Sequence, residues 1–203
     1  MKISVFVLLL LGALCISCGG AKSSNNASAR KVVTPVADPE IAVIEMENSS
    51  AYGTIKIELY SNIAPKMVAR FKELAKEGVY DGTTFHRINQ SVIQGGDPNS
   101  KDDDPLNDGM GRSEKPNLPA EFTSLPYDTG IVGAARGQEI NTANSQFFIT
   151  LKREAAFDNR YTIFGKVIDG MNNVRTISGV SPKEGERPVE AIRIKSVTIQ
   201  PRN

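Results

Sequence analysis

From Ile41 onward, apolar and polar side chains alternate over short stretches that are separated by glycine, proline and asparagine. Alternation with a period of two residues is typical of strands that bury one face, and the intervening residues favour turns. The pattern predicts strands at 41–46, 54–60, 84–88, 92–94, 130–134, 146–151, 162–167 and 192–199. The first two are close in sequence and form a predicted hairpin.

One segment between these strands has helical spacing instead. Pro65 suits the first turn of a helix, where its missing N–H needs no partner, and Gly78 suits the position just past the end. The apolar side chains between them recur every three or four residues, which predicts an amphipathic helix over 65–77. A second, shorter helix is predicted over 171–177. Many strands, two helices and regular glycine and proline residues favour a mainly β fold, a closed antiparallel barrel with helices over its ends.

Residues 1–40 lack both patterns. An apolar run over residues 5–14 follows a basic residue, and it is too short to cross a hydrocarbon core of roughly 30 Å as a helix. We interpret residues 1–17 as a signal peptide. Residues 18–40 are rich in glycine, serine, asparagine and alanine, which is the composition of a flexible tether. The folded domain is expected to occupy residues 41–203 as a single unit.

Cys18 follows the apolar run and a small residue, an arrangement that resembles the lipobox of bacterial lipoproteins. In that motif, cleavage falls just before the cysteine, which then carries the acyl chains that anchor the protein. Gly19 in place of aspartate resembles the sorting signal for the outer membrane. We therefore expect a lipid-anchored protein of the cell envelope whose folded domain faces the periplasm. Cys15 stands where the motif usually has leucine, and a plain secretory signal with an incidental cysteine remains the alternative.

Charge and composition exclude several classes of function. The 203 residues include 24 lysines and arginines and 23 aspartates and glutamates, for a net charge of +1, and the basic residues do not gather in one run. Nucleic acid is therefore not expected as a partner. The two cysteines, Cys15 and Cys18, and the single histidine, His86, are too few for a zinc site or a disulfide framework. We expect neither a metal nor a cofactor.

Polar and aromatic segments on predicted strands contain the candidate chemistry, and they are Phe85-His86-Arg87, Gln94-Gly95-Gly96-Asp97 and Ser145-Gln146-Phe147-Phe148-Ile149. Strand alternation puts Gln146, Phe148 and Thr150 on one face of their strand and Phe147 on the other. One phenylalanine can therefore fill the core, while the other is free to line a site beside a glutamine. A second core aromatic remains the alternative for Phe148.

The order of these motifs resembles that of the cyclophilins. The matching segments are Phe85-His86-Arg87, Gln94-Gly95-Gly96-Asp97, Gly130-Ile131-Val132, Ser145 to Ile149 and Phe164-Gly165-Lys166-Val167. The resemblance extends from about Ile41 to the end of the chain. It implies a closed eight-stranded antiparallel barrel capped by two α-helices. It also implies peptidyl-prolyl cis-trans isomerase activity on the outside of the barrel, with proline-containing polypeptides as clients.

Isomerisation of an X-Pro bond neither transfers nor cleaves a group, so it needs no nucleophile, and without a catalyst it takes tens to hundreds of seconds. Rotation breaks the amide resonance and leaves a more basic imide nitrogen. A fixed cation that donates to this nitrogen binds the twisted state better than either planar isomer. We expect Arg87 to be that donor, Gln94 to steady its guanidinium, and Phe148 to form an apolar floor for the proline ring.

By the same residue matching, the further side chains expected to line the substrate groove are Val92, Ala135, Arg136, Gln146, Phe157 and Tyr161. Some positions depart from the family. The segment 88–93 is one residue shorter than usual, and Ser91-Val92 replaces the usual Phe-Met pair of the proline pocket. Ala156-Phe157 stands where the family often has Trp-Leu, and Tyr161 replaces a frequent histidine.

These departures leave two hypotheses open. In the first, the protein is a working monomeric isomerase that assists the folding of envelope proteins. In the second, the altered pocket has left a peptide-binding or chaperone module with weak turnover. For single residues, Arg87 could be an ordinary solvated side chain, and Gln94 could cap a β-bulge. His86 could act as a general base with Asp97, although a structural hydrogen-bonding role is favoured. The polar loop 99–121 is expected to be exposed near the groove.

Overall fold

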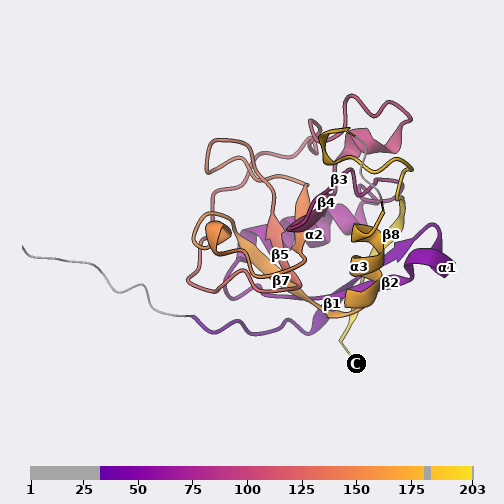
Figure 1. The fold of residues 1–203 in the computed structure, drawn as a ribbon. Coiled ribbons are helices and arrows are strands. Elements are labelled where there is room, and N and C mark those ends of the chain that lie inside the picture. Colours follow the sequence, from indigo (N-terminus) through magenta and orange to yellow (C-terminus); the bar gives the residue numbers. More distant parts are fainter. Residues whose placement is uncertain (1–32, 181–183, 203) are drawn as a thin grey trace, which may run out of the picture. The chain divides into compact units, whose positions relative to one another are not determined.

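The structure, a computed structural model, describes residues 33–180 and 184–202 (Figure 1). The predicted signal peptide, Cys18 and residues 18–32 of the predicted tether lie outside the described residues. In the part of the chain that is described, no helix is long enough and apolar enough to cross a membrane.

Eight strands form one sheet in which neighbouring strands are antiparallel. In chain order the strands are β1 (Glu40–Met46), β2 (Thr54–Leu59), β3 (Arg87–Ile88), β4 (Val92–Gly95), β5 (Ile131–Ala134), β6 (Phe147–Thr150), β7 (Ile163–Asp169) and β8 (Ile194–Pro201). Across the sheet their order is β3-β4-β6-β5-β7-β2-β1-β8. The hairpin predicted at the start of the domain is confirmed as the antiparallel pair β1 and β2.

The closed barrel predicted from the sequence is not confirmed, because the sheet is an open half-barrel whose edge strands are β3 and β8. The strand predicted at 84–88 forms a ladder only at Arg87 and Ile88, and a single bridge joins Thr84 to Arg193 ahead of β8. Since β3 has two residues, it offers no length of edge along which β8 could pair. Backbone N–H groups of Gly82, Phe85 and Ile194 donate to the carbonyls of Ile194, Ile192 and Thr83 at 2.8, 3.0 and 2.7 Å, so the approaches to the two edge strands meet, but no continuous ladder forms between β3 and β8.

The two predicted helices pack their apolar faces into the same core as the strands. They are α2 (Pro65–Lys76), which has Pro65 in its first turn, and α3 (Met171–Ser178). Phe71 of α2 lies at the centre of an aromatic group, with its ring 5.0 Å from Tyr80, 5.5 Å from Phe147 and 5.2 Å from Phe164 between centroids. These contacts fix α2 against the inward face of the sheet.

Shorter helical turns lie in the connections. They are α1 (Ser49–Tyr52) and the 3₁₀ turns η1 (Pro98–Lys101), η2 (Ala155–Phe157) and η3 (Glu184–Glu186). The sequence pattern predicts none of them, because one turn is too short to show the apolar repeat of a helix. η2 and η3 bear on the site described below, since they contribute Phe157 and Glu186.

The last residues of the predicted tether are fixed against the folded domain. The backbone N–H of Asp38 donates to Leu59 O at 2.8 Å, and its buried carboxylate accepts from Ser61 and from Lys72 Nζ, the latter at 2.7 Å. Burial alone would raise the pKa of Asp38, but the bonds from Lys72 and Ser61 lower it overall. The folded domain therefore begins upstream of residue 41, through contacts between residues that are far apart in sequence.

Candidate functional site

The outer face of the half-barrel carries an aromatic cluster separate from the main core. Side chains alternate along β6 as predicted, so that Phe147 lies in the main core and Phe148 in the outer cluster. The Phe148 ring stacks on Tyr127 at 5.7 Å and meets Phe157 and Tyr161 edge-on at 5.5 Å each. Tyr127 lies in a loop without a motif, so no sequence pattern predicts its place here.

Gly133 makes room for this cluster. It is paired with Phe148 across β5 and β6, and a Cβ atom at this position would overlap both the Phe148 ring and the Tyr127 hydroxyl. A side chain here would therefore displace the ring from the sheet. The absence of one lets Phe148 lie flat as the floor of a hollow.

Arg87 and Gln94 are directly opposite each other on β3 and β4. This register brings their side chains together, and Arg87 Nη1 donates to Gln94 Oε1 at 3.2 Å. The short connection 89–91 sets that register, because the length of a turn decides which residues of the two strands lie opposite each other. Arg87 is half-exposed and Gln94 is partly buried.

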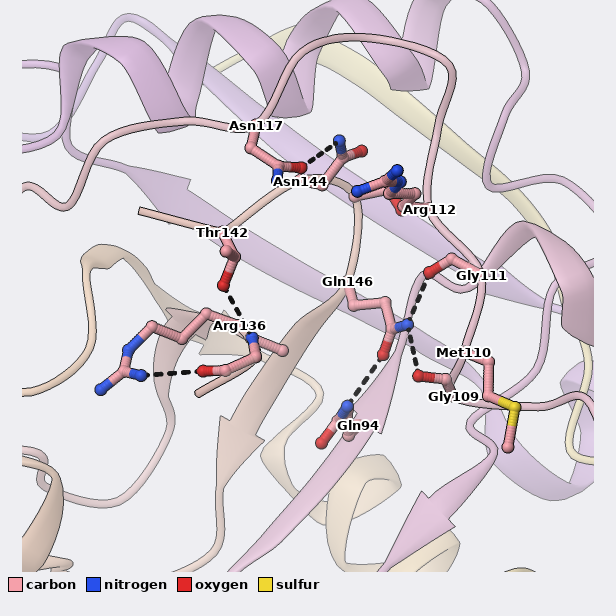
Figure 2. Close-up of a pocket in the computed structure, with 13 residues that line it drawn as sticks. Gln94, Gly109, Met110, Gly111, Arg112, Asn117, Arg136, Thr142, Asn144 and Gln146 are labelled. Atoms are coloured by element: carbon pink, nitrogen blue, oxygen red, sulfur yellow. Dashed lines mark hydrogen bonds between the residues drawn. The ribbon is translucent and has the colours of Figure 1, made fainter. Parts of the chain in front are cut away.

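A directional chain of side-chain amides continues from this pair (Figure 2). Gln94 Nε2 donates to Gln146 Oε1 at 2.9 Å, and Gln146 Nε2 donates to the carbonyls of Gly109 at 3.0 Å and Gly111 at 2.8 Å. Two carbonyls can accept only from an N–H, so they fix which end of the Gln146 amide faces the loop. That orientation in turn leaves Gln94 Oε1 facing the arginine.

Asp97 holds the loop that supplies those carbonyls. Its buried carboxylate accepts from the backbone N–H groups of Asn99 at 2.9 Å, of Gly109, and of Gly111 at 3.1 Å. Bonds from several N–H groups to one carboxylate are charge-assisted and strong. Asp97 is thus a structural acceptor that shapes the rim of the site.

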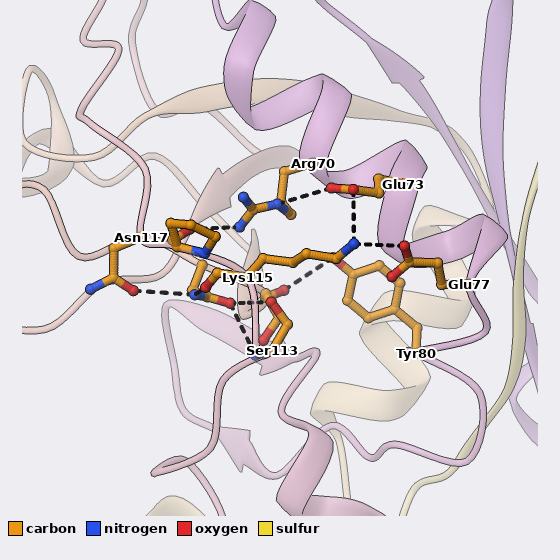
Figure 3. Close-up of polar contacts among 10 residues, drawn as sticks. Arg70, Glu73, Glu77, Tyr80, Ser113, Lys115 and Asn117 are labelled. Carbon is orange, nitrogen blue, oxygen red and sulfur yellow. Dashed lines mark hydrogen bonds and ion pairs between the residues drawn. The ribbon is translucent and has the colours of Figure 1, made fainter.

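The next part of the same loop is fastened to α2 (Figure 3). Lys115 Nζ binds the carboxylates of Glu73 at 2.9 Å and Glu77 at 2.7 Å. The backbone carbonyl of Lys115 accepts from Nδ2 of Asn144. Oδ1 of Asn144 accepts in turn from the backbone N–H and the hydroxyl of Ser113. The loop 99–121, predicted to be an exposed excursion near the groove, is therefore anchored on two sides where it borders the site.

Two adjoining cavities open on this face. The smaller, of about 90 Å³, is lined by Arg87, Val92, Gln94, Ala135, Arg136, Phe148, Phe157 and Tyr161. These are all of the predicted groove residues except Gln146. The larger cavity, of about 310 Å³, includes Gln146 and shares Gln94, Ala135 and Arg136 with the smaller one. The structure thus brings every predicted groove residue into one of two adjoining cavities, and the loop residues Gly109 to Arg112 add a wall that sequence reasoning missed.

Arg136 stands rigidly between the two cavities. Its guanidinium lies 4.8 Å from the centroid of the Tyr161 ring and donates to the carbonyls of Arg160, Gly137 and Gln138. With Nε and Nη1 bonded to carbonyls and the guanidinium over an aromatic ring, the side chain is held as a wall. Tyr161 therefore supports Arg136 as well as Phe148.

His86 does not form the acid–base pair considered from the sequence. The ring is buried, and although neither ring nitrogen has a hydrogen bond of good geometry to the described residues, an interaction with the Thr84 backbone favours its protonated form. Burial lowers the pKa of His86, and the nearby Asp97 only partly opposes this. The Asp97 carboxylate is already committed to backbone N–H groups. Over residues 33–180 and 184–202, no group of three or more histidine, cysteine, aspartate or glutamate side chains could hold a metal ion.

A further side chain reaches Arg87 from a distant part of the chain. Glu186 of η3 accepts from Arg87 Nε through Oε2 at 2.6 Å, and both side chains are exposed by about two fifths, at 45% and 42%. Sequence reasoning missed this contact because the two residues are 99 positions apart and Glu186 belongs to no motif.

Comparisons with known proteins agree with this geometry. A family model described as "Cyclophilin type peptidyl-prolyl cis-trans isomerase/CLD" matches residues 43–199. A Brucella suis protein named "Probable peptidyl-prolyl cis-trans isomerase" is 39% identical over 169 residues, which cover 81% of this chain and 85% of the relative. The Schizosaccharomyces pombe "Peptidyl-prolyl cis-trans isomerase ppi1" is 37% identical over 161 residues, or 76% of this chain and 96% of that protein.

The fold has solved counterparts as well. A crystal structure of a Cryptosporidium parvum cyclophilin type peptidyl-prolyl cis-trans isomerase, in the presence of the dipeptide Ala-Pro, matches with a TM-score of 0.71 and 31% identity. The match covers 80% of this chain and 99% of that one.

Proposed function

The chain belongs to the cyclophilin-type peptidyl-prolyl cis-trans isomerases, and on this basis we propose that it twists X-Pro bonds in the smaller cavity, with Arg87 donating to the imide nitrogen. The substrates of this family are proline-containing polypeptides. The structural relative studied with Ala-Pro supports an X-Pro unit as the element that is recognised. The positions of Arg87 and Phe148 around one hollow are the observation that supports the mechanism most directly.

Arg87 suits the role of donor because some N–H groups of its guanidinium are not bonded to the described residues. Nε donates to Glu186 and Nη1 to Gln94, whereas Nη2 is bonded to no described residue. A guanidinium has five N–H donors, so donors remain for a substrate beside the cavity that Arg87 lines. As the X-Pro bond twists, its nitrogen becomes more basic and accepts more strongly, which is the condition for stabilising the transition state over the ground state.

The required stabilisation is within reach of such a site. Lowering an isomerisation time from about 100 s to about 10 ms needs roughly 5 to 6 kcal/mol, since each tenfold is about 1.4 kcal/mol. A charge-assisted hydrogen bond contributes about 1.5 to 3 kcal/mol. In this proposal the rest comes from Phe148, on which the proline ring is held away from water, and from the orientation imposed by Gln94 and Gln146.

Arg87→Ala and Arg87→Lys test this mechanism with a protease-coupled or NMR exchange assay on an X-Pro peptide. We expect Arg87→Ala to lower kcat/KM by about tenfold or more, corresponding to about 1.4 kcal/mol of transition-state binding. Arg87→Lys keeps the charge but loses the planar fork, so we expect it to recover only part of the activity. A folded Arg87→Ala protein with full turnover would refute the mechanism.

The same assay separates the isomerase from the alternative considered above, a binding module with weak turnover. The shortened segment 88–93 and the Ser91-Val92 pair are the features behind that alternative. The intact chain Arg87–Gln94–Gln146 supports turnover instead, because it fixes the donor rather than merely presenting an apolar surface. A wild-type protein that binds X-Pro peptides without accelerating their exchange would favour the module.

We also propose that the protein is lipidated at Cys18 and works as a monomer at the cell envelope, where it assists the folding of proteins of that compartment. The support is the sequence alone: an apolar run, a small residue and a cysteine, followed by Gly19. If Cys18 becomes the first residue of the mature chain, residues 19–32 separate its acyl chains from the described part of the domain. Anchor and active site would then act independently.

Cys18→Ser tests the anchor, with Ser24→Ala as a matched change in the tether. We expect Cys18→Ser to move the protein from the membrane fraction to the soluble fraction with isomerase activity unchanged, and Ser24→Ala to do neither. Mass spectrometry of the wild-type protein should show acyl chains on Cys18. A soluble wild-type protein without acyl chains would refute lipidation.

A further inference from the structure

Arg87 is held by two residues from different parts of the chain. One is Gln94, its partner on the neighbouring strand, and the other is Glu186, in the loop that follows α3. Its Oε2 accepts from Arg87 Nε at 2.6 Å, while Gln94 accepts from Nη1 at 3.2 Å. Two acceptors on different nitrogens fix both the position and the plane of a guanidinium, whereas one acceptor leaves it free to swing. Arg87 has several rotatable bonds and a half-exposed side chain. These contacts therefore restrict conformations that the side chain would otherwise sample.

The carboxylate of Glu186 is itself oriented. Asn89 Nδ2 donates to both of its oxygens, at 3.2 and 3.1 Å. Asn89 Oδ1 accepts from the backbone N–H groups of Ser91 at 2.8 Å and Val92 at 3.0 Å, and so closes the turn between β3 and β4. One side chain thus shapes the shortened segment 88–93 and holds the carboxylate beside the arginine.

The backbone at Glu186 supports a role for this contact. Its φ angle is +67°, directly after Gly185 with φ +76°. Residues other than glycine adopt this region rarely, and such a conformation persists where surrounding contacts maintain it. The described contacts that do so here are the bonds to Arg87 and Asn89.

We propose that Glu186 is a positioning residue for the isomerase reaction, which orients the Arg87 guanidinium toward the substrate nitrogen. The proposal rests on the proposed function of Arg87 as the donor. Glu186 binds the Nε edge and so leaves Nη2 and part of Nη1 for the substrate. A donor that is already aimed before the X-Pro bond twists loses no orientation freedom in the transition state.

The opposite effect of Glu186 on turnover is the alternative that the experiment separates. A carboxylate beside Arg87 offsets part of its charge and competes for its donors. If that dominated, removal of Glu186 would raise turnover. The geometry favours positioning, because the carboxylate occupies Nε and leaves the Nη2 group unbonded among the described residues.

Glu186→Ala and Glu186→Gln test the proposal in the full chain, with Glu190→Gln as the control. Glu190 is exposed on the same loop and lines a separate cavity. We expect Glu186→Ala to lower kcat on an X-Pro peptide by about tenfold with KM changed by less than about threefold, because misaimed donors weaken the transition state more than the ground state. Glu186→Gln keeps an oxygen acceptor for Nε, so it should recover to within about threefold of wild type.

Two further measurements separate positioning from a general effect on the fold. The NMR resonance of Arg87 Nε–H should exchange faster with water in Glu186→Ala, while Glu186→Gln and Glu190→Gln leave it near its wild-type behaviour. In an Arg87→Ala background, Glu186→Ala should change kcat/KM by less than about twofold, because there is no guanidinium left to orient.

The outcomes distinguish this proposal from the one on which it rests. If Arg87→Ala retains full turnover, the donor role fails first. If Arg87→Ala is impaired but Glu186→Ala is as active as wild type or more active, Glu186 is not a positioning residue. A loss in Glu186→Ala that Gln does not recover, or that persists in the Arg87→Ala background, would overturn the proposal as well.

Discussion

Phe147 and Phe148 are consecutive residues of β6, and they pack into two different clusters on opposite faces of the sheet. Phe147 meets the rings of Phe71, Tyr80 and Phe85, all fully buried. Phe148 is itself buried, but its partners Phe157 and Tyr161 are only partly buried and line a cavity open to solvent. The same type of side chain therefore completes a core at position 147 and supports a groove at position 148.

The difference separates the residues that stabilise the fold from those of the proposed site. The inner cluster is enclosed by the sheet, α2 and α3, so a missing ring leaves a cavity that the surroundings cannot fill. The outer cluster ends at a hollow, so a change of shape there is accommodated more easily but alters the surface that a proline ring would meet. Substitutions in β6 separate the two roles.

Phe147→Ala should produce the largest effect, a loss of about 3 to 5 kcal/mol in the free energy of unfolding. The physical reason is the cavity left among three buried rings. Denaturant titration of the purified domain followed by circular dichroism measures the change. A loss below about 1 kcal/mol would show that the inner cluster collapses around the gap, and the distinction between the two faces would weaken.

Phe148→Leu should have the reverse effect, with a small loss of stability and a larger loss of activity. It keeps a buried apolar side chain, so the free energy of unfolding should fall by less than about 1.5 kcal/mol. Loss of the flat ring removes the floor of the smaller cavity and its contacts with Tyr127, Phe157 and Tyr161, so kcat/KM on an X-Pro peptide should fall about tenfold, as expected for one or two aromatic contacts. Unchanged activity in a folded variant would mean that Phe148 is only a second core residue.

His86, which lines a separate cavity, allows a smaller test through the pH dependence of stability. Burial lowers the pKa of His86 from its ordinary 6.5, so the folded state binds this proton less tightly than the unfolded state. Its contribution to stability is complete above the unfolded pKa and is lost as the pH falls below it. Between pH 7 and about 5.8, we expect the free energy of unfolding to fall by about 1 kcal/mol or less.

The control for this effect is His86→Gln, which is neutral at both pH values. Its free energy of unfolding should vary less between them than that of the wild type. Asp38, whose pKa is lowered by Lys72 and Ser61 despite its burial, loses its contribution at more acidic pH and so lies outside this window. An equal pH dependence in the two proteins would place the titrating group elsewhere.

The groove side should show no pH effect at all. The proposed step transfers no proton, and a guanidinium keeps its charge between about pH 6 and 9, so kcat/KM should vary by less than about twofold over that range. The measurement is the NMR exchange assay, which needs no protease. A bell-shaped profile centred near neutrality would return His86 to consideration as an acid or base.

Much of the fold follows from local sequence. The apolar period of two residues places Phe147 and Phe148 on opposite faces, and the proline at the start and the glycine after the end delimit α2. The motifs around Arg87, Gln94 and Phe148 identify the groove, because their order along the chain is itself the signal. These features depend on residues that are neighbours in sequence or share one strand.

The tertiary structure decided the rest, for one physical reason. Whether the sheet closes, which residues hold Asp38, how the loop 99–121 meets Gln146, and which carboxylate reaches Arg87 all depend on side chains that are many residues apart. Such contacts have no period and no fixed spacing, so they leave no pattern in the sequence. The sequence by itself determined the fold class, the groove and its aromatic floor, while only the folded chain brings Glu186 to the arginine and turns the amides of Gln94 and Gln146 into one directed chain.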